Sequence, residues 1–303
     1  MESLSSYAWS FLCKIGSMIS LASIGRNSLH AIGGDRALLL ARFIRKIPAL
    51  WREELCADQH RNKDWSPNRI FVAGDDAYFP IYCPEILDSP EGGFLRTYNV
   101  FRHQANAWYM RREVRNFIRY ALTARRFADV GSAEGFYSAL FASMHGRDAE
   151  ILSIDCGSIA GCNSAHSRIV RDQNASVFRP ARWDYLQAFV TDARLLKPAF
   201  HLPAETSVVT LSALLNGAHF APDLIKFDIE SSEYEVLLDS LGFFEACRPT
   251  LIIEVHNSIL VERGLSFLPV VKKLRDINYE VVACDVADYF HAGNCHVVMQ
   301  CFK

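Results

Sequence analysis

The chain has 303 residues, of which 50% are hydrophobic and 22% are charged, so it can form one large or two modest globular domains. Its 32 Lys and Arg residues against 34 Asp and Glu residues give a formal net charge of −2, which argues against nucleic acid as the main partner. Nine scattered cysteines without a CxxC pair argue against a structural zinc site and are typical of a reducing compartment. We therefore expect a cytoplasmic protein.

Residues 1–104 show no alternation of strands and helices, and we expect them to form an N-terminal extension. Residues 35–54 have amphipathic helical spacing with a basic face, which favours a helix packed on its own domain. Peripheral membrane contact through residues 1–55 stays open. The apolar stretch at 8–24 is interrupted and not preceded by positive charge, so we expect neither a signal peptide nor a membrane span there. Residues 69–83 predict a β-hairpin.

From residue 105 onward, strands and helices alternate, which predicts a domain over 105–303 with a doubly wound, mostly parallel α/β sheet. We expect seven strands, of which the last two form an antiparallel hairpin because no helix separates them. Residues 176–203 give no clear assignment. The expected strands are at 127–130, 151–154, 224–229, 251–255, 279–284 and 295–302, and residues 208–215 predict a strand edge that runs into the start of a helix. The other expected helices are at 105–122, 136–144, 232–244 and 267–278.

The run from Asp129 to Ser138 is the most informative segment of the sequence, because it predicts a strand, a glycine turn and a helix. Gly131 and Gly135 would let the backbone turn sharply beside a ligand. The next strand ends in Asp155, 20 residues after Gly135, an offset that suits a carboxylate binding a ribose diol. A structural turn without a ligand remains the alternative.

The residues of the turn favour a cofactor without phosphate groups over a dinucleotide. The strict dinucleotide pattern of three glycines is not met, and the carboxylate of Asp129 would repel a phosphate. S-adenosylmethionine carries an ammonium, a sulfonium and a ribose but no phosphate, so we interpret the turn as its site. Gly131, Ser132 and Gly135 would shape the methionine and ribose pocket, and Asp129 and Glu134 would bind the amine. A nicotinamide-dependent oxidoreductase is the less favoured enzyme, and a cofactor-binding or membrane-docked scaffold is the alternative without catalysis.

A second group of charges follows the strand at 224–229. Lys226, Asp228 and Glu230 alternate, so they share one face while the strand lasts, and charges in so apolar a strand need partners or a cleft. We expect all three in the catalytic centre, although Lys226 could simply pair with Glu230.

The helix that follows offers a second interpretation of the acidic residues there. Ser232 with Glu235 predicts a capping box, and Glu233 would favourably meet the helix dipole.

A third group ends the strand at 251–255, where Glu254 and His256 share a face. Neighbouring parallel strands would bring both near Asp228. His256 could act as a general base near neutral pH, or be an ordinary satisfied histidine. Asp228, Glu254 and His256 could also hold a divalent cation, which stays uncertain. The other histidines, including His296, carry no motif.

Together these motifs resemble the FkbM family of S-adenosylmethionine-dependent methyltransferases between about Phe127 and His256. The matching segments are Asp129-Val-Gly-Ser-Ala-Glu-Gly-Phe-Tyr-Ser138, Val209-Thr-Leu-Ser-Ala-Leu-Leu215, Lys226-Phe-Asp-Ile-Glu-Ser-Ser-Glu233, Arg248-Pro249 and Glu254-Val-His256. The resemblance implies a class I methyltransferase that transfers a methyl group to a hydroxyl of a sugar, polyketide or lipid-linked acceptor.

The sequence departs from the family pattern at four positions. Asp155 and Cys156 stand where the family usually has Glu and Pro, Ser231 replaces a Gly, and Ser212 replaces an Asp. A carboxylate for the ribose is kept. In this interpretation Asp228 and His256 orient or deprotonate the acceptor hydroxyl.

Overall fold

The computed structural model describes residues 69–74, 77–82, 105, 111–157, 164–192, 206–286 and 293–302. The chain divides into two compact units, Met1–Trp65 and Ser66–Lys303, and every described residue belongs to the second. The expectations for residues 1–55 therefore lie outside the described part. Among the described residues, no helix is long and apolar enough to cross a bilayer.

An eight-stranded sheet forms the centre of the second unit, in the order β6-β5-β4-β3-β7-β8-β10-β9. All neighbouring strands are parallel except β10, which runs antiparallel to both β8 and β9. The fold class is therefore confirmed, including the terminal hairpin. The strands are β3 (Arg126–Val130), β4 (Glu150–Asp155), β5 (Arg182–Val190), β6 (Ser207–Val209), β7 (Leu224–Phe227), β8 (Thr250–Val255), β9 (Tyr279–Cys284) and β10 (Cys295–Cys301).

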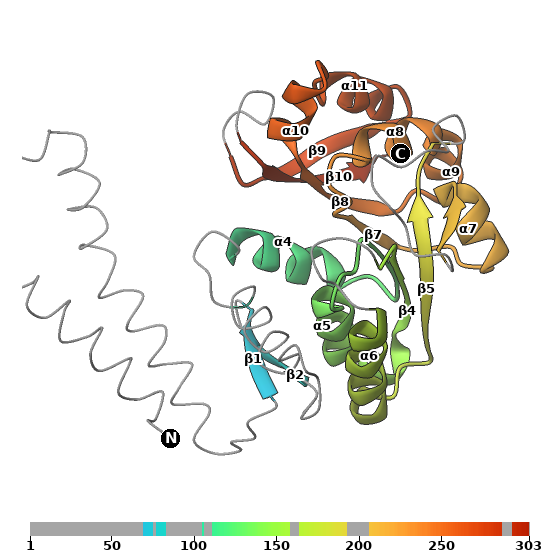
Figure 1. Cartoon of the computed structure of the whole chain (residues 1–303). Coiled ribbons are helices and arrows are strands. Elements are labelled where there is room, and N and C mark those ends of the chain that lie inside the picture. Colours follow the sequence, from blue (N-terminus) through green and yellow to red (C-terminus); the bar gives the residue numbers. More distant parts are fainter. Residues whose placement is uncertain are drawn as a thin grey trace, which may run out of the picture. The chain divides into compact units, whose positions relative to one another are not determined.

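Helices cover both faces of this sheet, as Figure 1 shows. The helices α4 (Arg111–Ala121), α5 (Phe136–His145) and α6 (Ser164–Phe178) pack on one face. The other face carries α7 (Leu211–Gly217), α8 (Glu233–Asp239), α9 (Leu241–Cys247), α10 (Asn257–Glu262) and α11 (Leu268–Asp276). A short 3-10 helix, η3 (Gly146–Asp148), links α5 to β4.

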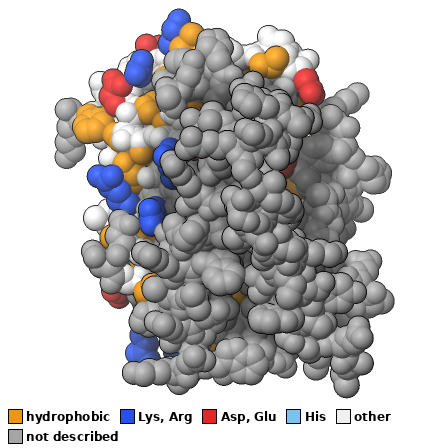
Figure 2. Space-filling model, turned by 90° about the vertical axis from the view of Figure 1, so that its left-hand side faces the viewer, with side chains coloured by type: hydrophobic (Ala, Val, Ile, Leu, Met, Phe, Trp, Pro, Cys, Tyr) orange, Lys and Arg blue, Asp and Glu red, His pale blue; other side chains and the backbone are white. Residues whose placement is uncertain are grey.

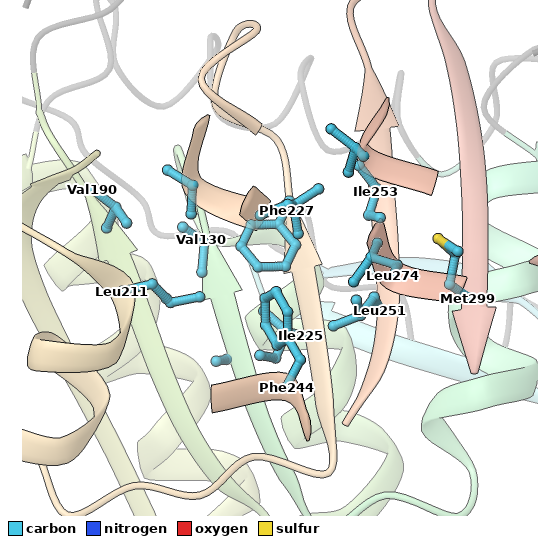
Figure 3. Close-up of a cluster of buried hydrophobic side chains, with 14 of the residues drawn as sticks. Val130, Val190, Leu211, Ile225, Phe227, Phe244, Leu251, Ile253, Leu274 and Met299 are labelled. Carbon is cyan, nitrogen blue, oxygen red and sulfur yellow. The ribbon is translucent and has the colours of Figure 1, made fainter. Parts of the chain in front are cut away.

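Two hydrophobic cores follow from strand alternation. On one face, Phe127, Leu224 and Ile252 pack with α4 and α5, and on the other, Val130, Phe227 and Ile253 pack with α7–α11. Figure 3 shows the second core, where Phe244 and Leu274 from the helices meet the strand side chains. The surface drawn in colour in Figure 2 mixes Lys and Arg with acidic and hydrophobic side chains.

The predicted hairpin is confirmed as β1 (Arg69–Ala73) and β2 (Tyr78–Tyr82), which pair antiparallel. Its Ile70, Val72 and Ile81 are buried in the core that α4 and α5 share. Asn174 of α6 binds the edge of β2, because its Oδ1 accepts from Tyr82 N at 2.9 Å and its Nδ2 donates to Tyr82 O at 2.7 Å. The hairpin thus packs within the same compact unit as the large sheet.

The structure differs from the expected elements in a few places. The unassigned stretch contains the end of α6 and all of β5, and β5 brings the sheet to eight strands rather than seven. Strand β7 ends at Phe227 rather than at residue 229, and Glu230 has a left-handed φ of 54°. The long helix expected at 232–244 is two helices, because the chain bends at Ser240.

The sheet reverses its order between β3 and β7, which is where open α/β sheets bind ligands. At this point Asp228 N donates to Val130 O at 3.0 Å, so the two strand ends stay together. Gly131 has a φ of 85°, and a Cβ added to it would lie 1.8 Å from the carbonyl oxygen of Asp228. Only glycine therefore permits this approach.

We predict that Gly131→Ala lowers the free energy of unfolding by at least about 3 kcal/mol, because a Cβ would separate β3 from β7 in addition to straining the turn. Urea denaturation measures the change. Gly242→Ala is the matched control, since no heavy atom lies within 4 Å of its added Cβ. Equal stability of the two variants would contradict the close approach.

Candidate active site

The turn after β3 forms one wall of a pocket at the carboxyl ends of the strands. Gly131 N and Ser132 N both donate to Ile154 O, at 2.9 and 3.0 Å, which ties the turn to β4. Gly135, with a φ of 86°, begins α5. Asp155 closes this wall, because its Oδ2 accepts from Ala133 N at 2.9 Å and its Oδ1 from Gly157 N at 2.7 Å. Desolvation by burial raises the pKa of Asp155.

The pocket joins this turn to the end of β7. Its lining is mostly apolar, with carboxylates from Asp155, Asp228 and Glu230 at the rim, which is the usual composition of a small-molecule site. The lining residues are Val130, Gly131, Ala133, Ile154, Asp155, Cys156, Ala188, Phe189, Val190, Asp228, Ile229 and Glu230. Sequence reasoning missed Ala188, Phe189 and Val190, because the strand that carries them showed no recognisable pattern.

Asp129 and its neighbours in the motif lie beneath the pocket wall rather than in the lining. Asp129 is buried and accepts a 2.6 Å hydrogen bond from Ser138 Oγ, which also lies 2.7 Å from Ser153 Oγ. Burial raises the pKa of Asp129 to about 6, against the opposing charge of Lys226. Ser132 and Glu134 are buried too, and neither lines the pocket. The contact of Asp129 and Glu134 with a cofactor amine stays a prediction, as does the part of Ser132 in shaping the pocket.

Lys226 is a fully enclosed cation at the centre of the sheet. Its Nζ lies 3.1 Å from Asp228 Oδ2, 3.5 Å from Glu113 Oε1 and 4.7 Å from the centroid of the Tyr137 ring. Burial would lower the pKa of Lys226, but the charges of Asp228, Glu113, Glu254 and Asp129 raise it above its usual range. Lys226 therefore pairs with Asp228 and Glu113, and the alternative pairing with Glu230 is absent among the described residues.

The predicted proximity of Asp228, Glu254 and His256 is confirmed. His256 Nε2 lies 3.5 Å from Glu230 Oε2, 3.7 Å from Glu254 Oε1 and 3.9 Å from Asp228 Oδ1. Burial would lower the pKa of His256, but the hydrogen bond and charge of Glu233, with Glu254 and Asp228, raise it to about 9. At neutral pH the free protein thus presents an imidazolium among carboxylates. Burial raises the pKa of Glu230, and Lys226 and His256 lower that of Asp228 against burial.

The capping box predicted at Ser232 and Glu235 is wrong. Ser232 makes no side-chain capping hydrogen bond, and Glu235 pairs with Arg263 instead. A second hydrogen bond holds Arg263 beside Glu235, because its guanidinium also donates to Ser231 O at 3.0 Å. Glu233 is the acid that turns back over the start of α8, where its Oε1 accepts from Ile229 N at 2.7 Å.

A second buried histidine, which carried no motif in the sequence, extends the charged cluster. His296 Nε2 lies 3.1 Å from Glu113 Oε2 and 3.3 Å from Glu254 Oε2, and its Nδ1 lies 2.8 Å from Asp285 Oδ2. Burial would lower the pKa of His296, but Glu113, Asp285 and Glu254 raise it to about 12. The available signal was the pairing of β10 with β8, which sets His296 opposite Glu254.

Two groups of side chains in this cluster have ligand atoms close enough for one cation. Asp228, Glu254 and His256 form one, as the sequence suggested, and Glu113, Glu254 and His296 form the other; within each, the ligand atoms lie within 4.8 Å of one another. Lys226 contacts both groups and neutralises part of their charge. The arrangement permits a divalent cation, but the ammonium group of Lys226 already supplies a positive charge to these carboxylates.

The architecture defines the class of protein. A mostly parallel sheet with an antiparallel strand inserted next to its edge, and a glycine turn at the switch point, is the class I methyltransferase fold. The model of the methyltransferase FkbM domain matches residues 158–281. The resemblance to this methyltransferase family is thereby confirmed, and the glycine turn of β3 precedes the matched segment.

Solved structures of methyltransferases are similar at low identity. The methyltransferase FkbM of Methylobacillus flagellatus KT is 13% identical with a TM-score of 0.40, over 67% of this chain and 58% of that one. The O-methyltransferase TomG of Streptomyces achromogenes is 8% identical with a TM-score of 0.38, over 62% and 78%. No curated protein sequence matches the chain.

We predict that Lys226→Met destabilises the protein by about 3–5 kcal/mol, because it leaves Glu113 and Asp228 without their shared cation. Lys273→Met is the control, since Lys273 forms an exposed pair with Asp276 at 3.2 Å and should change stability by less than about 0.5 kcal/mol. Urea denaturation at pH 7 compares both variants with wild type. A Lys226 variant as stable as the control would refute the role of the buried cation.

Proposed function

We propose that this protein binds S-adenosylmethionine in the pocket between β3 and β7 and transfers its methyl group to a hydroxyl of a small-molecule, glycan or lipid-linked acceptor. The observation that carries the proposal is a single pocket whose rim has Asp155 on one side and Asp228 on the other. His256 approaches Asp228 from β8 at 3.9 Å. Membership of the matched domain in a methyltransferase family supports the same reaction.

The residues present fit this cofactor. The Gly131 backbone approaches the end of β7 without a side chain, and Asp155 keeps lone pairs on both oxygens beyond the two backbone donors that it accepts. A ribose diol can donate to such a carboxylate. The apolar segment Ala188–Val190 can cover a planar base. Three carboxylates near the rim favour a ligand with positive charge, and a pyrophosphate would be repelled.

The cofactor supplies an electrophilic methyl group on a sulfonium. The protein's task is to hold the acceptor oxygen in line with that methyl and to accept the hydroxyl proton. Asp228 is suited to orient the hydroxyl, because Lys226 and His256 keep it ionised. In its neutral form, which becomes populated as pH rises toward the pKa of about 9, His256 is suited to take the proton through Nε2. The positive charge after transfer would be stabilised by Glu233, Glu254 and Asp228.

The cofactor site is tested by calorimetric titration with S-adenosylhomocysteine, with and without magnesium. We predict micromolar binding by wild type, and a dissociation constant raised about tenfold by Asp155→Ala, because the charged acceptor for the ribose is lost. Asp172→Ala on the exposed side of α6 is the control and should bind like wild type. No binding by folded wild type would refute the proposal, and a magnesium effect would favour a metal at Asp228, Glu254 and His256.

We predict that His256 titrates near pH 9, which ¹³C-labelled histidine and an NMR pH series can measure, with His256→Gln assigning the signal. The folded pKa is raised above the usual value of 6.5. The stability that the charged imidazole contributes is therefore complete below about pH 6.5 and is lost as pH rises through about 9. If His256 takes the acceptor proton, methyl transfer should increase about tenfold per pH unit below that pKa. A ring that titrates near 6.5 would contradict the carboxylate surroundings.

A further inference from the structure

Glu233 is a buried acid at the start of α8 whose carboxylate faces inward. It is 2% exposed, and its Oε1 serves two partners, the backbone N–H of Ile229 at 2.7 Å and His256 Nδ1 at 3.2 Å. A carboxylate that only interacts with the helix dipole can stay at the surface, where it keeps its hydration and no desolvation cost arises. Its enclosure beside an imidazole therefore calls for a further role.

The two sides of the His256 ring differ in how they are held. Nδ1 has one acceptor at hydrogen-bonding distance, Glu233. Nε2 makes no hydrogen bond with the described residues and faces Asp228, Glu230 and Glu254 at 3.5–3.9 Å. Asp228 and Glu230 line the pocket, so Nε2 is the nitrogen directed to its rim.

We propose that Glu233 is a positioning residue for His256: it accepts a hydrogen bond from Nδ1–H, fixes the tautomer and ring orientation, and in the neutral ring leaves the Nε2 lone pair for the acceptor hydroxyl. The inference rests on the proposed function of His256 as the proton acceptor. A carboxylate on the far nitrogen of an imidazole is a common means of fixing its tautomer. The backbone supports it, because the Ile229 N–H holds the same oxygen in place.

The other charges around the ring cannot replace Glu233. Asp228 and Glu230 follow β7 and Glu254 lies on β8, and all three approach Nε2. Lys226 is held by Asp228, and His296 by the far oxygen of Glu254, so both act on the ring only through these carboxylates. Glu235, two residues after Glu233, pairs with Arg263 and has no contact with His256 among the described ion pairs.

The experiment compares wild type with Glu233→Ala and Glu233→Gln, with Glu235→Gln as the control in the same helix. The first readout is the His256 Nδ1 proton, observed by NMR with ¹⁵N-labelled histidine and assigned with His256→Gln. We expect a hydrogen-bonded, slowly exchanging signal in wild type and in the Glu235 control. Glu233→Gln should keep the signal, because its amide oxygen still accepts from an N–H, and Glu233→Ala should lose it.

The second readout separates this inference from the function it rests on. S-adenosylhomocysteine binding should stay within about twofold of wild type in every variant, because Glu233 does not line the pocket. If wild type does not bind S-adenosylhomocysteine, the cofactor proposal is refuted, whereas the His256 Nδ1 signal still tests the positioning role of Glu233. An Nδ1 signal that persists in Glu233→Ala would overturn the positioning role. If Glu233→Ala does not fold, an Nδ1 signal in Glu233→Gln that exchanges as fast as in free histidine would overturn it instead.

Discussion

The buried ammonium of Lys226 is the interaction on which the site depends. It lies in the middle strand of the sheet, between β3 and β8, and faces carboxylates from three other segments of the chain. Glu113 enters from α4, Asp129 from β3 and Glu254 from β8, and Asp228 follows Lys226 at the end of the same strand. Without this cation, these acids would repel one another in a region that has little access to water. The charged face of the sheet can therefore exist only around it.

The charges around Lys226 are divided between structure and pocket. Glu113 of α4 pairs with His296, which also pairs with Asp285, and Asp129 accepts a hydrogen bond from Ser138. Asp155 is the last residue of β4, and Asp228 and Glu230 follow the end of β7, so these three carboxylates reach the pocket. The position of a carboxylate relative to the strand end thus decides whether it supports the fold or meets a ligand. This is the physical reason for the switch-point location of the site.

The order of the strands also separates two tasks. The turn after β3 and the ends of β4 and β5 form the side that fits a nucleoside, because they supply a glycine backbone, Asp155 and apolar cover. The ends of β7 and β8 supply the acid and imidazole groups that suit a reacting hydroxyl. Gly131 joins the two sides, because its missing side chain lets the backbone at Asp228 come close.

The sequence by itself determined the fold class, most strands, the glycine turn and the three motifs, because strand alternation and glycine spacing are local properties. It also brought Asp228, Glu254 and His256 together, since parallel strands end at one edge. It did not reveal β5, whose mixed polar and apolar residues hide its period, or His296, which is brought to Glu254 only by the antiparallel pairing of β10 with β8. Only the tertiary structure decided that Asp129 lies beneath the pocket wall, that Lys226 pairs with Glu113, and that Glu233 rather than Glu235 turns inward. These choices depend on which elements pack together, and residues far apart in the chain set them.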